Sequence, residues 1–237
     1  MSIASKLQDI LAAKADIKDA INAKGGEVTA ATPLADYAQA IEDLPSGGLD
    51  EYLTKQLQGQ LTEIRIPQGV VNIGAYACYN QIYCTYIHIP SSVRTIGNNA
   101  FFKGSDITQE VVLEIDNGVT EIQSLAFRMN NIKRVVLPDS LVTLAAQAFM
   151  FCYQIEYVEF GTDITSIGVN NFIYTRRQNM VIVVKATTPP TLSGSLFPNN
   201  YTTGKIYVPD ASVNDYKTAT NWSTYASYIY PLSDYQP

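Results

Sequence analysis

The sequence predicts an α/β solenoid with a short parallel sheet, preceded by a small α-helical module at the amino terminus. Two observations support this prediction: a block of four apolar positions recurs five times, and a short alternating apolar pair leads into each block. The spacing inside the block is constant, whereas the connector to the next strand varies in length. A constant core pattern with variable connectors is typical of solenoids, in which each repeat buries its apolar face against its neighbours.

The repeated block places apolar residues at intervals of four, three and five positions, and it usually ends in phenylalanine. The blocks begin at residues 66, 89, 115, 137 and 160, so the repeat length runs from 22 to 26 residues. This length is typical of leucine-rich repeats, each of which contributes one strand to a parallel sheet. The predicted core positions are Ile66, Val70, Ile73 and Cys78; Ile89, Val93, Ile96 and Phe101; Ile115, Val119, Ile122 and Phe127; Leu137, Leu141, Leu144 and Phe149; and Phe160, Ile164, Ile167 and Phe172.

The alternating pairs before the blocks have the period of two that indicates a strand with one buried face. Pro67, Pro90 and Pro138 directly follow three of these pairs, and proline ends a strand because it lacks a donor and fixes φ. Two further strands are expected at the carboxyl end of the chain. We therefore expect one parallel sheet, in sequence order, with strands at 64–66, 87–89, 113–115, 135–137, 158–160, 182–184 and 206–208.

The run I-x-I-P-x-x-V-x-x-I-G-x-x-A-F resembles the BspA-like leucine-rich repeats of bacterial surface proteins. Ala-Phe stands at 100–101, 126–127 and 148–149, and Ile-Gly stands at 73–74, 96–97 and 167–168. The family's terminal pattern is matched by ATTPP at 186–190 and by the segment from Tyr207 to Tyr216. The resemblance spans roughly residues 60 to 233 and implies a repeat domain that binds other molecules.

The amino-terminal region divides into a helical assembly module, residues 1–45, and a linker, residues 46–59, before the solenoid of residues 60–237. A first helix is expected over residues 3–22, and Thr32-Pro33 should open a second, with threonine as N-cap and proline at the first helical position. Such a module is too small to be stable alone, so it should pack on itself, on a copy or on a partner. The residues expected to mediate assembly are Ile3, Leu7, Ile10, Ile17 and Ile21.

The segment over residues 6–44 also resembles short helical segments in bacteriophage tail and fibre proteins. This resemblance implies attachment to other virion proteins through residues 1–45 and a homo-oligomer, with a trimer as the leading hypothesis because phage fibres commonly trimerise. The alternative is a helical hairpin that simply caps the first repeat. At the other end, Ser212 should open a short helix as part of a capping box, and residues 209–233 should cap the solenoid.

The chemistry of the sequence argues against several classes of function. A net charge of −6 without a basic stripe excludes nucleic-acid binding, and no segment is apolar enough for membrane insertion. The amino terminus does not have the pattern of a signal peptide. Three sparse cysteines indicate buried or half-buried free thiols, and no motif predicts a catalytic site, a metal site or a cofactor. We therefore expect a protein that is not an enzyme.

The best candidates for binding are side chains that flank buried strand positions and should line one concave ladder on the sheet. They are Arg65, Tyr86, His88, Glu114, Arg134, Tyr157, Glu159 and Tyr207. Two functions fit this pattern. The first is a phage virion protein (fibre, tail or head decoration), made in the host cytoplasm, whose repeats bind a host surface protein or glycan. The second is a BspA-like adhesin on a bacterial cell surface.

Overall fold

The computed structural model describes residues 61–104, 109–173, 180–196 and 204–236, and these residues wind into a β-solenoid. They belong to one unit of the chain, Gly59–Pro237. The predicted helical module (residues 1–45), its linker (46–59) and Phe197 lie outside the described residues, so the predictions made for them stay predictions.

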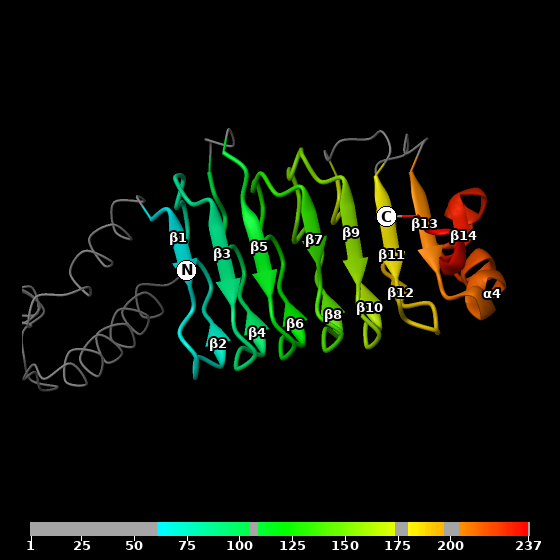
Figure 1. Ribbon diagram of the computed structural model, residues 1–237, viewed down its shortest axis with the longest axis horizontal. Helices are drawn as coiled ribbons and strands as arrows, with labels where there is room; N and C mark the ends of the chain where they lie inside the picture. Colours follow the sequence, from blue (N-terminus) through cyan, green and yellow to red (C-terminus); the bar gives the residue numbers. More distant parts are fainter. Residues whose placement is uncertain (1–60, 105–108, 174–179, 197–203, 237) are drawn as a thin grey trace, which may run out of the picture. The chain divides into compact units, whose positions relative to one another are not determined.

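Each of the first six described turns of the solenoid contributes one strand to a long-strand row and one to a short-strand row (Figure 1). All pairings within these rows are parallel. The long-strand row contains β1 (Glu63–Arg65), β3 (Tyr86–Ile89), β5 (Val112–Ile115), β7 (Arg134–Val136), β9 (Tyr157–Phe160), β11 (Val181–Val184), β13 (Lys205–Val208) and β14 (Ile229–Pro231). The short-strand row contains β2 (Asn72–Ile73), β4 (Thr95–Ile96), β6 (Glu121–Ile122), β8 (Thr143–Leu144), β10 (Ser166–Ile167) and β12 (Thr191–Leu192).

The prediction of a single sheet through all long strands was wrong at one junction. The strands 87–89 and 113–115 pair as expected, but β1, β3 and β5 form a three-stranded sheet, and β7, β9, β11, β13 and β14 form a separate five-stranded sheet. The break lies where the shortest repeat, from Ile115 to Leu137, follows the longest, from Ile89 to Ile115. The short-strand row runs unbroken across this junction and holds the turns in register.

The predicted α/β class also needs correction, because the described part is mostly sheet. Its helices belong to the carboxyl-terminal end: η1 (Asp210–Ser212), α4 (Val213–Thr218), η2 (Ser223–Tyr228) and η3 (Leu232–Asp234). Within the repeats, the chain passes from the short-strand row back to the long-strand row through tight turns. These turns recur with a left-handed residue, such as Asn99 or Leu125, two positions before the last core residue of the block. A left-handed residue interrupts a right-handed helix, so the turns do not extend into helices.

The core lies between the two rows and follows the predicted pattern. All predicted core positions are buried except Ile66, Val70 and Ile115, which are half-buried. Phe101, Phe127, Phe149 and Phe172 form a continuous stack, with ring centroids 5.2, 5.1 and 6.2 Å apart. The two half-buried residues of the first block, Ile66 and Val70, lie in the first described turn, where only one neighbouring turn among the described residues covers them.

The carboxyl-terminal cap closes the solenoid in a way that the sequence predicted only in part. The helix after Ser212 is present, but Ser212 makes no capping hydrogen bond; its hydroxyl donates to the Thr187 carbonyl at 2.6 Å instead. Tyr216 and Trp222 donate similarly to the carbonyls of Ala186 and Pro190, both at 2.8 Å. The cap therefore holds the 186–190 segment through its backbone, and the predicted capping box is wrong.

Candidate binding face

The eight predicted binding residues lie on the long-strand row, on the side opposite the core. We call this surface the outward face. Alternation along each strand directs Ile64, Ile87, Leu113, Val135 and Val158 into the core and leaves their neighbours outside. The parallel register places Arg65, His88 and Glu114 beside one another, and it places Arg134 beside Tyr157. Glu159 and Tyr207 lie in one register line on either side of Val183.

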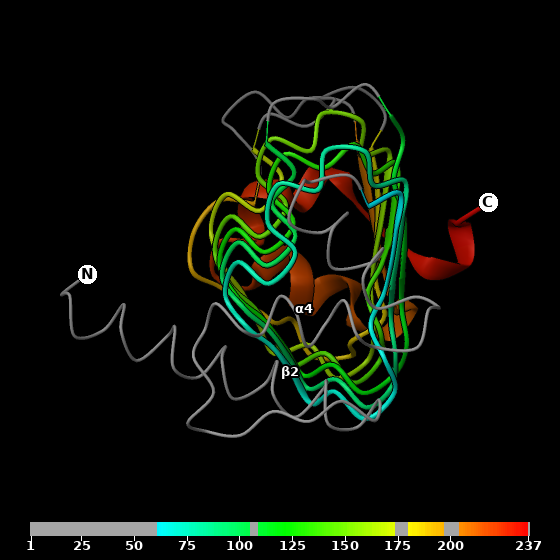
Figure 2. The same ribbon diagram turned by 90° about the vertical axis from the view of Figure 1, so that its left-hand side faces the viewer.

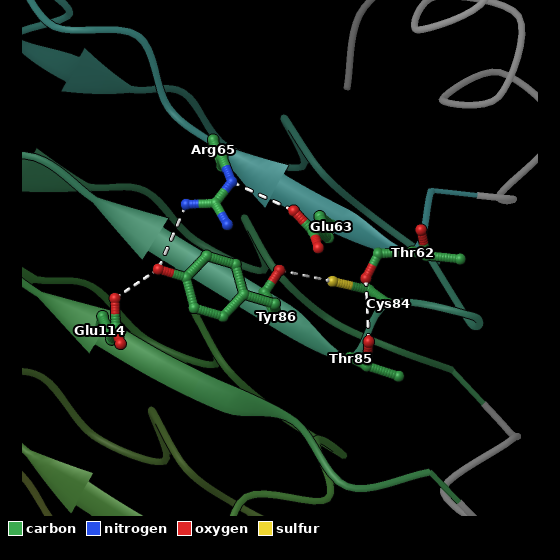
Figure 3. A network of polar contacts seen from close by, with 7 residues as sticks. All are labelled: Thr62, Glu63, Arg65, Cys84, Thr85, Tyr86 and Glu114. Carbon is green, nitrogen blue, oxygen red and sulfur yellow. Dashed lines mark hydrogen bonds and ion pairs between the residues drawn. The ribbon is translucent and has the colours of Figure 1, made fainter.

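Four side chains on the three-stranded sheet form a front cluster: Glu63, Arg65, Tyr86 and Glu114 (Figure 3). The Arg65 guanidinium lies 4.3 Å from the Tyr86 ring centroid, and its Nη1 donates to the Tyr86 hydroxyl at 3.4 Å. Arg65 Nε also donates to Glu63 Oε2 at 3.1 Å, and the Tyr86 hydroxyl donates a short hydrogen bond to Glu114 Oε2. This last bond is the main reason that the pKa of Tyr86 is raised.

His88 extends the front cluster toward the next turn. Its Nε2 lies 3.3 Å from Asp116 Oδ2, and both side chains are partly exposed. The sequence places Asp116 directly after β5, in the position that proline occupies in three other repeats.

A rear cluster on the five-stranded sheet has the same types of contact and consists of Arg134, Tyr157, Glu159 and Lys185. Arg134 lies 3.7 Å from the Tyr157 ring centroid, and the Tyr157 hydroxyl donates a short hydrogen bond to Glu159 Oε2. Lys185 Nζ binds the other oxygen of Glu159 at 2.5 Å. Partial burial alone would raise the pKa of Glu159, but hydrogen bonds from Lys185 and Tyr157 outweigh burial and lower that pKa.

Tyr207 does not present an open ring, although the sequence placed it on the binding ladder. Its exposed fraction is only 5%. Tyr230 and Tyr235 pack against it, with ring centroids 6.1 and 5.0 Å away. Sequence reasoning also missed Glu63 and Lys185, which complete the two clusters. Lys185 directly follows a strand whose residues are all apolar, so period-two alternation gave no signal for it.

An open groove of about 400 Å³ lies beside the cap, between the turn at 162–165 and the segment 186–191. Threonine hydroxyls line it, together with Asp163 and the rings of Pro189 and Pro190. The groove shares no residue with either cluster.

Several predictions about chemistry can be examined on the described residues. Cys78, Cys84 and Cys152 are free and buried, as predicted, and burial raises the pKa of Cys78 and Cys152 to about 12. Within the same residues, no group of three His, Cys, Asp or Glu side chains is placed to hold a metal ion. None of the helices seen in this part of the chain has the length and apolar character needed to cross a membrane.

A stack of parallel turns with a polar strand face defines a repeat protein of the leucine-rich-repeat type. The pattern of the BspA type leucine rich repeat region matches residues 56–179 in six copies, which is more than half of the chain. The protein therefore belongs to the BspA-type leucine-rich repeat family, as the repeated motif indicated.

Other comparisons give little beyond this family. No curated protein sequence matches the chain. Among solved structures, a leucine-rich repeat protein from Bacteroides ovatus is similar at 17% identity and a TM-score of 0.37. The match covers 65% of this chain and 56% of the length of that protein.

Proposed function

We propose that the protein is a non-enzymatic binding module whose outward face contacts a protein or glycan ligand. One observation carries the proposal: an arginine stacked on a tyrosine that donates to a glutamate occurs on both sheets, as Arg65, Tyr86 and Glu114 and again as Arg134, Tyr157 and Glu159. No requirement of the core accounts for this recurrence, because the side chains point away from it.

The chemistry of the outward face suits recognition. Tyrosine and arginine are enriched at binding hot spots, because they bury a large area and also hydrogen-bond. The Arg65–Glu63 pair is more than half exposed on both sides, so it adds little to stability, and its groups can exchange partners with a ligand at small cost. Neighbouring strands, about 4.8 Å apart, hold these side chains on a rigid support.

We further propose that the module is part of a phage virion, as a fibre, tail or head decoration. The resemblance of residues 6–44 to phage tail and fibre segments supports this proposal. In it, residues 1–45 bind other virion proteins and form a homo-oligomer, and the solenoid contacts the host. The alternative, an adhesin on a bacterial surface, is favoured by the family to which the repeats belong. Mass spectrometry of purified phage particles and of bacterial surface fractions separates the two locations.

The binding proposal is tested with fluorescently labelled full-length protein on an array of bacterial and animal glycans and on intact bacterial and animal cells. Arg65→Ala and Tyr86→Ala should each reduce the bound signal about tenfold, the usual effect of a hot-spot truncation. Tyr76→Ala is the matched control, because it removes an exposed tyrosine from the turn after β2, away from the outward face. Equal binding by all four proteins would contradict the proposal.

A further inference from the structure

The carboxyl-terminal segment of the chain lies on the outward face. After β14, the chain turns through η3 and carries Tyr235 over the five-stranded sheet. The Tyr235 ring lies 5.0 Å from Tyr207 on β13 and 6.1 Å from Tyr157 on β9. Figure 2 shows this segment, in red, outside the row of long strands.

This segment, residues 232–236, is weakly attached; we call it the tail. No residue of η3 is buried, and Tyr235 itself is only half-buried. Asp210 fixes the start of the tail: its Oδ1 accepts a hydrogen bond from the Ser233 amide at 3.0 Å, and its carboxylate also interacts with the Ser233 side chain and the Leu232 backbone. An internal hydrogen bond from the Tyr235 amide to the Leu232 carbonyl, also 3.0 Å, keeps the tail in its turn.

The tail occupies the rear cluster in the manner of a ligand. Arg134 stacks on the Tyr157 ring, and the Tyr235 ring packs against Tyr157 as well. In the front cluster Arg65 stacks on Tyr86, but no second aromatic ring packs on Tyr86 among the described residues. An arginine–tyrosine stack is therefore seen once without a further ring and once with a tyrosine from a short peptide segment packed against it.

We propose that the rear cluster, with Tyr207, is a docking site for an extended polypeptide segment that carries a tyrosine, and that the tail is its resident occupant. This inference rests on the proposed function and narrows its ligand, for this part of the face, to polypeptide rather than glycan. An external segment must displace the tail, and this exchange is feasible because the Ser233–Asp210 hydrogen bond is exposed and Tyr235 is only half-buried.

The test supplies the tail in trans. The probe is a blocked synthetic peptide with the sequence of residues 231–237. It is titrated by calorimetry into two full-length proteins, the wild type and Asp210→Ala/Tyr235→Ala. In the double variant the resident tail has lost its hydrogen bond to Asp210 and the ring contacts of Tyr235. The double variant should bind the peptide at least about tenfold more tightly, because in the wild type a tethered tail competes at millimolar effective concentration. Binding should be lost when the peptide tyrosine is replaced by alanine or when Tyr157→Ala is added to the protein.

Thermal denaturation by circular dichroism checks that the double variant is folded. Its two substitutions leave the phenylalanine stack and the cap hydrogen bonds of Ser212, Tyr216 and Trp222 in place. If the folded double variant gives no saturable binding up to about 5 mM peptide, the proposal is overturned and the tail is only part of the cap. Equal binding by wild type and double variant, or binding unaffected by Tyr157→Ala, overturns it too. A wild-type dimer that Tyr235→Ala converts to monomer would show that the tail is exchanged between copies, contrary to the assignment.

The result is separable from the proposed function. If Arg65→Ala loses cell or glycan binding but no peptide binds at the rear cluster, the proposed binding function stands. Only the inference that the rear cluster docks a polypeptide is then overturned. Peptide binding that depends on Tyr157, without any effect of Arg65→Ala or Tyr86→Ala, supports the tail inference and contradicts a role for the front cluster.

Discussion

Phe101 and Phe127, from adjacent turns, stack with ring planes 2° apart and centroids 5.2 Å apart. Phe149 continues the stack on the other side of Phe127 at 5.1 Å. Phe127 is thus enclosed on both faces by aromatic rings and is fully buried. The recurrence of phenylalanine at the end of four of the five blocks follows from this arrangement, because the rings of successive turns stack on one another.

Phe127→Ala should lower the free energy of unfolding by about 3–5 kcal/mol, the usual cost of emptying a large aromatic core site. Urea denaturation followed by circular dichroism measures the change. Tyr79→Ala, at an exposed ring that stacks on Phe102, is the control and should cost far less. A denaturation midpoint equal to that of the wild type would show that the stack does not stabilise the fold.

The repeat has glycine after isoleucine at a position where the backbone of the previous turn lies very close, as at Gly97 and Gly168. A Cβ on Gly168 would lie 2.2 Å from the Ala146 amide nitrogen, whereas a Cβ on Gly74, in the first described turn, meets nothing within 4 Å. Gly168→Ala should therefore destabilise the protein by about 1–3 kcal/mol, as overpacking does. Gly74→Ala should be nearly neutral in the same urea titration. Equal effects of the two substitutions would contradict the steric explanation.

The inward half of this structure was predictable because it is local and periodic. Period two identified Ile87 and Ile89 as strand residues, and constant spacing identified Phe101 and Phe127 as equivalent core positions. The short-strand row was not predicted, because strands of two residues carry no alternation; only their buried members, such as Ile96, were recognised as core. The break after β5 depends on how connectors of different length position one turn against the next. The sequence of a single repeat contains no information about that position.

The sequence indicated which residues lie on the outward face, but not which of them contact one another. Alternation identified Arg65, Tyr86 and Glu114 as outward residues, yet their partnership depends on the register between strands. The packing of Tyr235 on Tyr207 joins the end of the chain to a strand about thirty residues earlier, through a turn anchored by Asp210. Neither composition nor spacing marks that contact.

A recurrent left-handed residue offers a way to stabilise the solenoid. Gln147 has φ 63°, and the equivalent positions in other turns include Asn99 and Asn170. Asparagine tolerates the left-handed region better than glutamine does. Gln147→Asn should raise the free energy of unfolding by up to about 1 kcal/mol, and Asn99→Ala should lower it by a similar amount. Chemical denaturation measures both, and a loss of stability in Gln147→Asn would refute the conformational argument.

The assembly role of residues 1–45 predicts different subunit numbers for the full chain and for a chain of residues 48–237. The shorter chain keeps its carboxyl-terminal cap and should be a folded monomer, whereas the full chain should be a homo-oligomer, with a trimer expected. Multi-angle light scattering measures both masses. If the two have the same subunit number, residues 1–45 are better interpreted as an amino-terminal cap.

Acid should release the tail from the outward face. Asp210 has a lowered pKa, chiefly because its carboxylate accepts the hydrogen bond from the Ser233 amide. A carboxylate with a depressed pKa stabilises the attached state above its ordinary pKa, and that stabilisation is lost as the pH falls through the lowered value. The tail should therefore stay attached at neutral pH and detach progressively below about pH 4, the ordinary range of aspartate. The Ser233 amide signal in ¹⁵N-resolved NMR spectra should shift over this pH range, and the shift should be absent in Asp210→Asn. A Ser233 signal that follows the same titration in the wild type and in Asp210→Asn would show that another group holds the tail.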